Sequence, residues 1–186
     1  MKRFRITFTF CLICFCFFFN ASHAQQAEVE AEEGLLKVNF ILKFPDFVEW
    51  PPHSVVSDPK FPFIIGVLGE TPILPHLIEI AKDKTIKDKK IKIKVMDISD
   101  LSGIKECSIL FISEFSRRRF KKIMDEIGNL PVLTIGDTED YARRGVMINM
   151  FPEHNFVRFN INSSAAEKNK ISINSKILSR AKNIFK

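Results

Sequence analysis

Three short apolar runs constrain the fold of this chain more than any other feature of its sequence. They are FIIGVL at Phe63–Leu68, CSILFIS at Cys107–Ser113 and PVLTI at Pro131–Ile135. Apolar runs of this length, bounded by turn residues and lacking polar alternation, are typical of strands covered on both faces, as in parallel sheets. The sequence therefore predicts an α/β domain in which these three strands lie side by side and helices cover both faces of the sheet.

Helical patterns separate the strands. Thr71 is an expected N-cap for a helix over residues 72–82, and Ser116 is an expected N-cap for a helix over residues 116–128. A shorter helix is expected over residues 138–142, after the turn that follows the third run. The repeated order of strand and helix is typical of βα units in a parallel sheet.

The remaining strands are of a different kind. Ile91, Ile93 and Val95 alternate with lysines, which predicts a half-exposed or edge strand. Residues 145–151 and 156–161 are predicted to form an antiparallel hairpin, followed by a helical region that starts at 163 or 164, is interrupted over 171–174 and resumes at 175. The expected architecture is one three-layer α/β domain with a mixed, mostly parallel sheet and a C-terminal antiparallel hairpin.

The most apolar segment outside the extreme N-terminus is VNFILKFPDFVEWPP at 38–52, which holds the only Trp of the chain. Its apolar residues recur at three- and four-residue steps, so they predict a helix with one buried face. Pro45 predicts a kink or break within it, and Pro51 and Pro52 end it. Trp50 is expected to pack in the core, which we prefer over a role in ligand stacking.

The first 24 residues have the pattern of a signal peptide. Lys2, Arg3 and Arg5 precede an apolar run from 8 to 19, and small residues at Ser22 and Ala24 form an export cleavage site. Cleavage is expected after Ala24, leaving residues 25–186 as a single domain. An uncleaved membrane anchor is the alternative, although the run is short for a membrane span; a lipoprotein is less consistent with the sequence.

Charge and cysteine content argue against a nucleic-acid-binding protein and against a disulfide-stabilised one. The formal net charge of +6 includes three basic residues of the leader and no acidic ones, so half of it disappears on cleavage, and nucleic acid is a poor candidate partner. Three of the four cysteines also lie in the leader. The fourth, Cys107, is expected to be buried and inert rather than bonded to another chain.

No catalytic or metal-binding pattern is present. His53, His76 and His154 stand alone, without the spacing of a metal site, and no P-loop, nucleophile elbow or dinucleotide fingerprint is found. Carboxylates at 137, 139 and 140 could be imagined as an acid and base pair, but their expected place beside a short surface helix favours ordinary solvated side chains. The mature chain is therefore expected to bind rather than catalyse, with no metal and no cofactor.

Two basic segments are candidate binding surfaces. Arg117, Arg118 and Arg119 are expected in the first turn of a helix, where cations are mildly unfavourable, so we interpret them as a patch that faces a partner. The lysine-rich segment 82–94 could contact an anionic polymer or lipid headgroups, although a charge run is usually a solvated face.

Taken in order, these segments resemble the YfiR-like family of periplasmic regulatory proteins, from about Leu35 to the end of the chain. The residues that carry the resemblance are FVEWP at 47–51, IGVLG at 65–69, the strand with Cys107, VLTIG at 132–136, GVM at 145–147 and FVRFNIN at 156–162. Within these segments we single out nine family-motif residues, which we expect to be structural: Phe47, Trp50, Pro51, Gly69, Cys107, Gly136, Gly145, Arg158 and Asn160.

The resemblance implies a periplasmic protein, often dimeric, that restrains a membrane-bound diguanylate cyclase by contacting its periplasmic sensor region. Such a regulator lowers cyclic di-GMP output and hence biofilm formation. The genes of other family members lie near genes for sensor kinases or outer-membrane receptors, so these proteins remain alternative partners. Binding of a small ligand or cell-wall fragment is a further alternative. This chain departs from the well-known members in having Pro45 and in leaving Cys107 without an internal partner, which argues against disulfide-based sensing.

Overall fold

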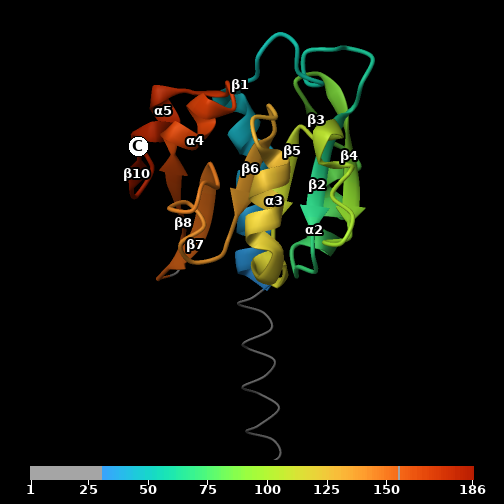
Figure 1. Cartoon of the computed structure of the whole chain (residues 1–186). Coiled ribbons are helices and arrows are strands. Elements are labelled where there is room, and N and C mark those ends of the chain that lie inside the picture. The colour runs from blue at the N-terminus through green and yellow to red at the C-terminus, as the bar shows by residue number, and fades with distance from the viewer. Residues whose placement is uncertain (1–30, 155) are drawn as a thin grey trace, which may run out of the picture.

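A twisted sheet forms the middle layer of the protein (Figure 1). The computed structural model describes residues 31–154 and 156–186, and among these the sheet has eight strands in the order β10-β8-β7-β6-β5-β2-β4-β3. The strands are β2 (Phe63–Leu68), β3 (Thr85–Ile86), β4 (Lys89–Met96), β5 (Ile109–Ile112), β6 (Leu133–Gly136), β7 (Ile148–Glu153), β8 (Phe156–Asn162) and β10 (Ile184–Phe185).

The three apolar runs are adjacent, as predicted. β2 pairs with β5, and β5 pairs with β6, both in parallel, with Ile65 opposite Ile109 and Ile109 opposite Leu133. The hairpin β7–β8 is antiparallel and extends the sheet beyond β6, which confirms the mixed, mostly parallel sheet. The chain passes from β2 to β4 and then crosses to β5 on the other side of β2, so the winding reverses between β2 and β5. Crevices at the carboxyl ends of strands at such a reversal commonly bind ligands.

Helices cover both faces, giving the three predicted layers (Figure 1). The helix over residues 31–43 and α2 (Leu74–Ala81) bury side chains in one apolar cluster, whereas α3 (Phe120–Ile127) contributes to a second cluster. The middle strand β5 divides its side chains between the two clusters by its pleat: Ile109 and Phe111 face one, Leu110 and Ile112 the other. All four are fully buried, which explains why the run shows no polar alternation.

The predicted helix through Trp50 is wrong in its second half. The α-helix ends at residue 43, a 3₁₀ helix follows over Phe44–Phe47, and the strand β1 (Val48–Glu49) then pairs antiparallel with β9 (Ser172–Ile173). Pro45 has no N–H to donate, which favours the break. The backbone after it bonds instead to a distant segment, and the N–H of Asn174 donates to the carbonyl of Phe47 at 2.9 Å.

Four other helix predictions need correction. Thr71 is not the N-cap of α2, because the helix begins at Leu74 and its N-cap position is Ile73. Ser116 is not an N-cap, because it lies inside a 3₁₀ helix, Glu114–Arg119, and α3 begins only at Phe120. The predicted helix over 138–142 is a series of turns. The C-terminal helices are short, with α4 over Ser163–Lys168 capped by Asn162 rather than a serine, and α5 over Ser175–Leu178. Beyond α5 the chain forms the strand β10, which is held by pairing with β8.

The predicted leader and its cleavage site after Ala24 lie outside the described residues. Within 31–154 and 156–186, no helix is both long enough and apolar enough to cross a bilayer.

Candidate functional site

The aromatic segment that follows the first helix closes one end of the domain. The Trp50 ring is partly buried and meets the ring of Phe63 edge to face, with 5.8 Å between centroids. Its Nε1 is buried and has no partner in the described part of the chain. The carbonyl of Pro51 accepts from the N–H of Ser54 at 3.0 Å. Phe47 and Trp50 therefore pack against the core cluster between the N-terminal segment, the sheet and β9, whereas Pro51 lies in the turn that follows.

The three motif glycines lie where a side chain would collide or strain the backbone. Gly69, with φ of +84°, follows β2, and a Cβ there would lie 2.6 Å from the hydroxyl of Ser113. A Cβ on Gly136 would lie 2.8 Å from the ring of Tyr141, while Gly145 has φ of +105°. Each glycine therefore permits a turn or a close approach at the end of a strand or loop.

Cys107 is fully buried and free, which confirms its predicted burial. Burial raises the pKa of its thiol to about 11. The thiol is therefore protonated at neutral pH and is a poor nucleophile. Arg158, whose direction the sequence did not decide, is exposed on β8 and forms an ion pair with Glu153 at 3.5 Å.

The three arginines lie in the exposed 3₁₀ helix Glu114–Arg119, at the carboxyl ends of β2, β4 and β5. We call this 3₁₀ helix the shelf. Phe115, which is 65% exposed, precedes the arginines in the sequence. Ile98, Phe115 and the three arginines line one surface pocket. Phe115 and Ile98 also line a second surface pocket together with Val95, which is 57% exposed. We call this the Phe115 surface, defined by Val95, Ile98, Phe115, Arg117, Arg118 and Arg119.

Hydrogen bonds fix this shelf to the sheet. The hydroxyls of Ser113 and Ser116 both donate to the carbonyl of Leu68, at 3.0 and 2.8 Å. Among the described residues, only Arg117 of the three forms an ion pair, with Glu114 at 3.9 Å, where both side chains are exposed and the interaction is weak. Arg119 lies close enough to Asp97 for its charge to contribute to the lowered pKa of that carboxyl. The Phe115 surface is thus an exposed aromatic side chain beside exposed cations, in a segment that is hydrogen-bonded to the end of β2.

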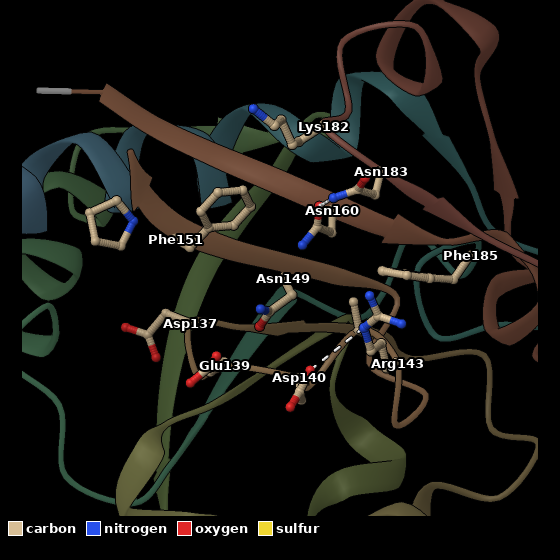
Figure 2. Close-up of a pocket in the computed structure, with 12 residues that line it drawn as sticks. Asp137, Glu139, Asp140, Arg143, Asn149, Phe151, Asn160, Lys182, Asn183 and Phe185 are labelled. Atoms are coloured by element: carbon tan, nitrogen blue, oxygen red, sulfur yellow. Dashed lines mark hydrogen bonds and ion pairs between the residues drawn. The ribbon is translucent and has the colours of Figure 1, made fainter. Parts of the chain in front are cut away.

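A separate cavity of about 420 Å³ lies over the hairpin β7–β8, on the sheet face that carries α3 (Figure 2). Three asparagines line it, from β7, β8 and the segment before β10: Asn149, Asn160 and Asn183. We call it the asparagine pocket. Its other lining residues are Asp137, Glu139, Asp140, Ala142, Arg143, Phe151, Pro152, Lys182 and Phe185.

Asn149 is the most buried polar group of this pocket. It lies opposite Gly136 in the register of β6 and β7, and only 3% of it is exposed. Its Oδ1 has no hydrogen-bond partner in the described part of the chain. Figure 2 shows the side chain extending from β7 toward the loop that carries Glu139 and Asp140. Asn160 is differently placed, because its Oδ1 already accepts from Asn183 Nδ2 at 2.9 Å.

Ion pairs surround the pocket. Lys37 Nζ lies 2.9 Å from Asp137 Oδ2 and 2.8 Å from Glu33 Oε1, which ties the first helix to the end of β6. Burial alone lowers the pKa of Lys37, but its attraction to Asp137 and Glu33 outweighs burial and leaves the pKa above its usual value. Lys182 pairs with Glu153 at 2.8 Å, whereas Arg143 lies over the Phe185 ring and 3.6 Å from Asp140.

The carboxylates at 137, 139 and 140 therefore lie on a turn that forms one wall of a pocket, not beside a surface helix. Sequence reasoning missed Asn149, Lys182, Asn183 and Phe185 altogether. One signal was available: Asn149 interrupts the apolar run VMINMF, and a polar residue inside a buried strand needs a partner. Asn160 was singled out only as a structural family residue, yet it also lines this pocket.

Among the described residues, no three histidine, cysteine or carboxylate side chains are grouped so that they could hold a metal ion. The chemistry available here is hydrogen bonding and charge attraction at the asparagine pocket, and apolar contact with a basic rim at the Phe115 surface.

Comparison with known proteins identifies the family. A search of curated proteins finds no match. One solved structure that the comparison matches is described as the ABC domain in complex with L-Trp from Streptococcus pneumonia; it is 9% identical, with 66% of this chain and 55% of that chain covered and a TM-score of 0.49, and it supports no argument about this chain. The sequence profile of the YfiR/HmsC-like family, in contrast, matches residues 34–182, most of the chain. The chain therefore belongs to the YfiR/HmsC-like family.

Proposed function

We propose that this chain is an exported periplasmic regulator that restrains a membrane-bound signalling protein, in the first instance a diguanylate cyclase, and so lowers cyclic di-GMP output. Membership of the YfiR/HmsC-like family supports the proposal, as does the leader-like sequence of residues 1–24. The proposed role requires binding and no catalysed reaction. A sensor kinase or an outer-membrane receptor would use the same kind of surface, and the partner recovered with the chain distinguishes these cases.

The single observation that carries the proposal is the Phe115 surface. Aromatic residues and arginines are enriched at the energetic centres of protein interfaces, and here an exposed Phe stands beside three arginines. The expected occupant is an apolar segment with acidic neighbours in the periplasmic region of the partner. Because Ser113 and Ser116 anchor the shelf to β2, little conformational entropy is lost when it binds.

Regulation would follow from differential affinity. If the chain binds the inactive arrangement of its partner more tightly than the active one, it shifts the population toward the inactive state. A tenfold difference in affinity corresponds to about 1.4 kcal/mol of bias. No conformational change in the regulator itself is needed.

The docking surface is tested by affinity between the purified mature chain and the periplasmic region of the co-purified partner. Phe115→Ala and the charge reversal R117E/R118E/R119E should each weaken binding about tenfold or more. Phe156→Ala, which removes another exposed ring, is the matched control for Phe115. K84E/K87E/K90E, on exposed lysines away from this surface, is the control for charge. Unchanged affinity in both test variants would remove the assignment of this surface.

Export is tested in the cell that expresses the chain. The periplasmic fraction should contain a protein whose N-terminal residue is Gln25. Recovery of the full-length chain in the inner membrane would instead support the alternative of an uncleaved anchor and would contradict a freely diffusing regulator.

A further inference from the structure

The asparagine pocket contains a hydrogen-bond acceptor that the described protein leaves unused. Asn149 Oδ1 is buried, has no partner in the described residues and belongs to a side chain that lines the cavity. A buried polar atom without a partner is costly, because it has given up its hydrogen bonds to water without replacing them. A ligand that places an N–H or O–H donor against this oxygen would recover that energy.

The charges near this oxygen favour a cationic donor. Glu33, Asp137, Glu139 and Asp140 lie at this end of the pocket or bond to its wall, whereas the cations on the same side are Lys37 and Arg143. Lys37 is already shared between two carboxylates, and Glu139 has no ion-pair partner among the described residues. The local charge is therefore negative, and a positively charged donor gains attraction that a neutral donor does not.

We propose that the asparagine pocket binds a small molecule by its primary ammonium group, which donates to Asn149 Oδ1 and is attracted by Glu139. The cavity volume of about 420 Å³ is near the lower end for small-molecule sites, which limits the ligand to one amino sugar or a short diamine. Phe151, Pro152 and Phe185 offer apolar contact to its carbon skeleton, and the amide of Asn160 offers a further polar contact.

Calorimetric titration of the mature chain with single compounds tests this assignment. Glucosamine carries an ammonium group with neighbouring hydroxyls, putrescine carries ammonium groups without hydroxyls, and N-acetylglucosamine keeps the sugar but has no ammonium group. Saturable binding of glucosamine or of putrescine at one site per chain is expected. The compound that binds more tightly shows whether the pocket takes an amino sugar or a diamine. N-acetylglucosamine should bind at least about tenfold more weakly, because the charge attraction is lost.

Two variants locate the site. Asn149→Leu should abolish binding while leaving the unfolding temperature of the ligand-free chain unchanged or higher, because the replaced acceptor has no partner. Glu139→Gln should weaken binding about tenfold, whereas Glu126→Gln, an exposed carboxylate on α3, should leave it unchanged. Glu139 is exposed, so this pair reports on binding even if the Asn149 variant folds poorly.

Three results would overturn the proposal. They are the absence of saturable binding by either amine, equal binding of glucosamine and N-acetylglucosamine, and unchanged amine binding in both Asn149→Leu and Glu139→Gln. The titration contains no signalling partner, so its outcome is independent of the proposed regulatory role.

Discussion

At the scale of single residues, Trp50 shows how an apolar side chain can carry an unsatisfied polar atom. Its ring packs against Phe63, while its Nε1 is buried without a partner in the described residues. Trp50→Ala should lower the free energy of unfolding by about 3 kcal/mol, through lost burial and the cavity left behind. Denaturation followed by circular dichroism measures this change.

Trp50→Phe is the matched variant. It keeps an aromatic ring beside Phe63 and removes the unpaired N–H, so the expected loss is below about 1 kcal/mol. A loss that small for Trp50→Ala would contradict a core role and would place the indole on a functional surface instead.

The buried thiol of Cys107 should make the free energy of unfolding fall at alkaline pH. Burial raises the pKa of its thiol from 9.0 to about 11, so the folded state holds this proton more tightly than the unfolded state. The resulting stabilisation is complete below pH 9 and is lost as the pH rises to about 11. The free energy of unfolding of the wild type should therefore fall more steeply over this range than that of Cys107→Ala, and parallel curves would contradict the assignment.

At the scale of secondary structure, one ion pair joins elements that are far apart in the sequence. Lys37 on the first helix reaches Asp137 at the end of β6, and the two side chains are only 12% and 14% exposed. Lys37→Met leaves Asp137 and Glu33 without their shared cation, so we expect a loss of about 2 kcal/mol in the free energy of unfolding.

A second lysine on the same helix provides the control. Lys43 pairs with Asp46, but these side chains are 69% and 52% exposed, so Lys43→Met should change stability by less than about 0.5 kcal/mol. Equal effects of the two substitutions in urea denaturation would show that the Lys37 pair does not tie the helix to the sheet.

At the scale of the whole molecule, the sheet links both apolar clusters into one unit. The first helix, β1 and β9 share a cluster with β2, β5 and β6, and β2 and β5 also contribute side chains to the α3 cluster on the other face of the sheet. Fluorescence of Trp50, the only Trp of the chain, should therefore report the same urea midpoint as circular dichroism of the whole chain. An earlier fluorescence transition would show that the N-terminal segment unfolds as a separate unit.

Much of this fold could be read from local sequence. The apolar runs at β2, β5 and β6 predicted adjacent buried strands, and the segments before and after Pro152 predicted the hairpin. Cys107 was correctly expected to be buried. These predictions succeed because burial on two faces imposes a composition that is visible within six or seven residues.

Predictions failed where distant backbone partners decided the structure. Val48 continues a helical pattern in the sequence, yet its backbone pairs with β9, and Ile184 continues another helical pattern but pairs with β8. Ser116 has the chemistry of an N-cap, but the carbonyl of Leu68 accepts its hydroxyl. In each case a hydrogen bond to a remote strand outweighs a local propensity worth a fraction of a kcal/mol.

The sequence by itself determined the class of fold, the buried strands and the family, because periodicity and ordered motifs are local properties of the chain. It also singled out Arg117, Arg118 and Arg119, but only the tertiary structure decided what surrounds them and revealed the asparagine pocket. The asparagine pocket needs residues from the loop after β6, from both strands of the hairpin and from the segment before β10, and the Phe115 surface needs the ends of neighbouring strands. Parallel and antiparallel pairing brings these residues together through space, so their spacing in the sequence could not reveal them.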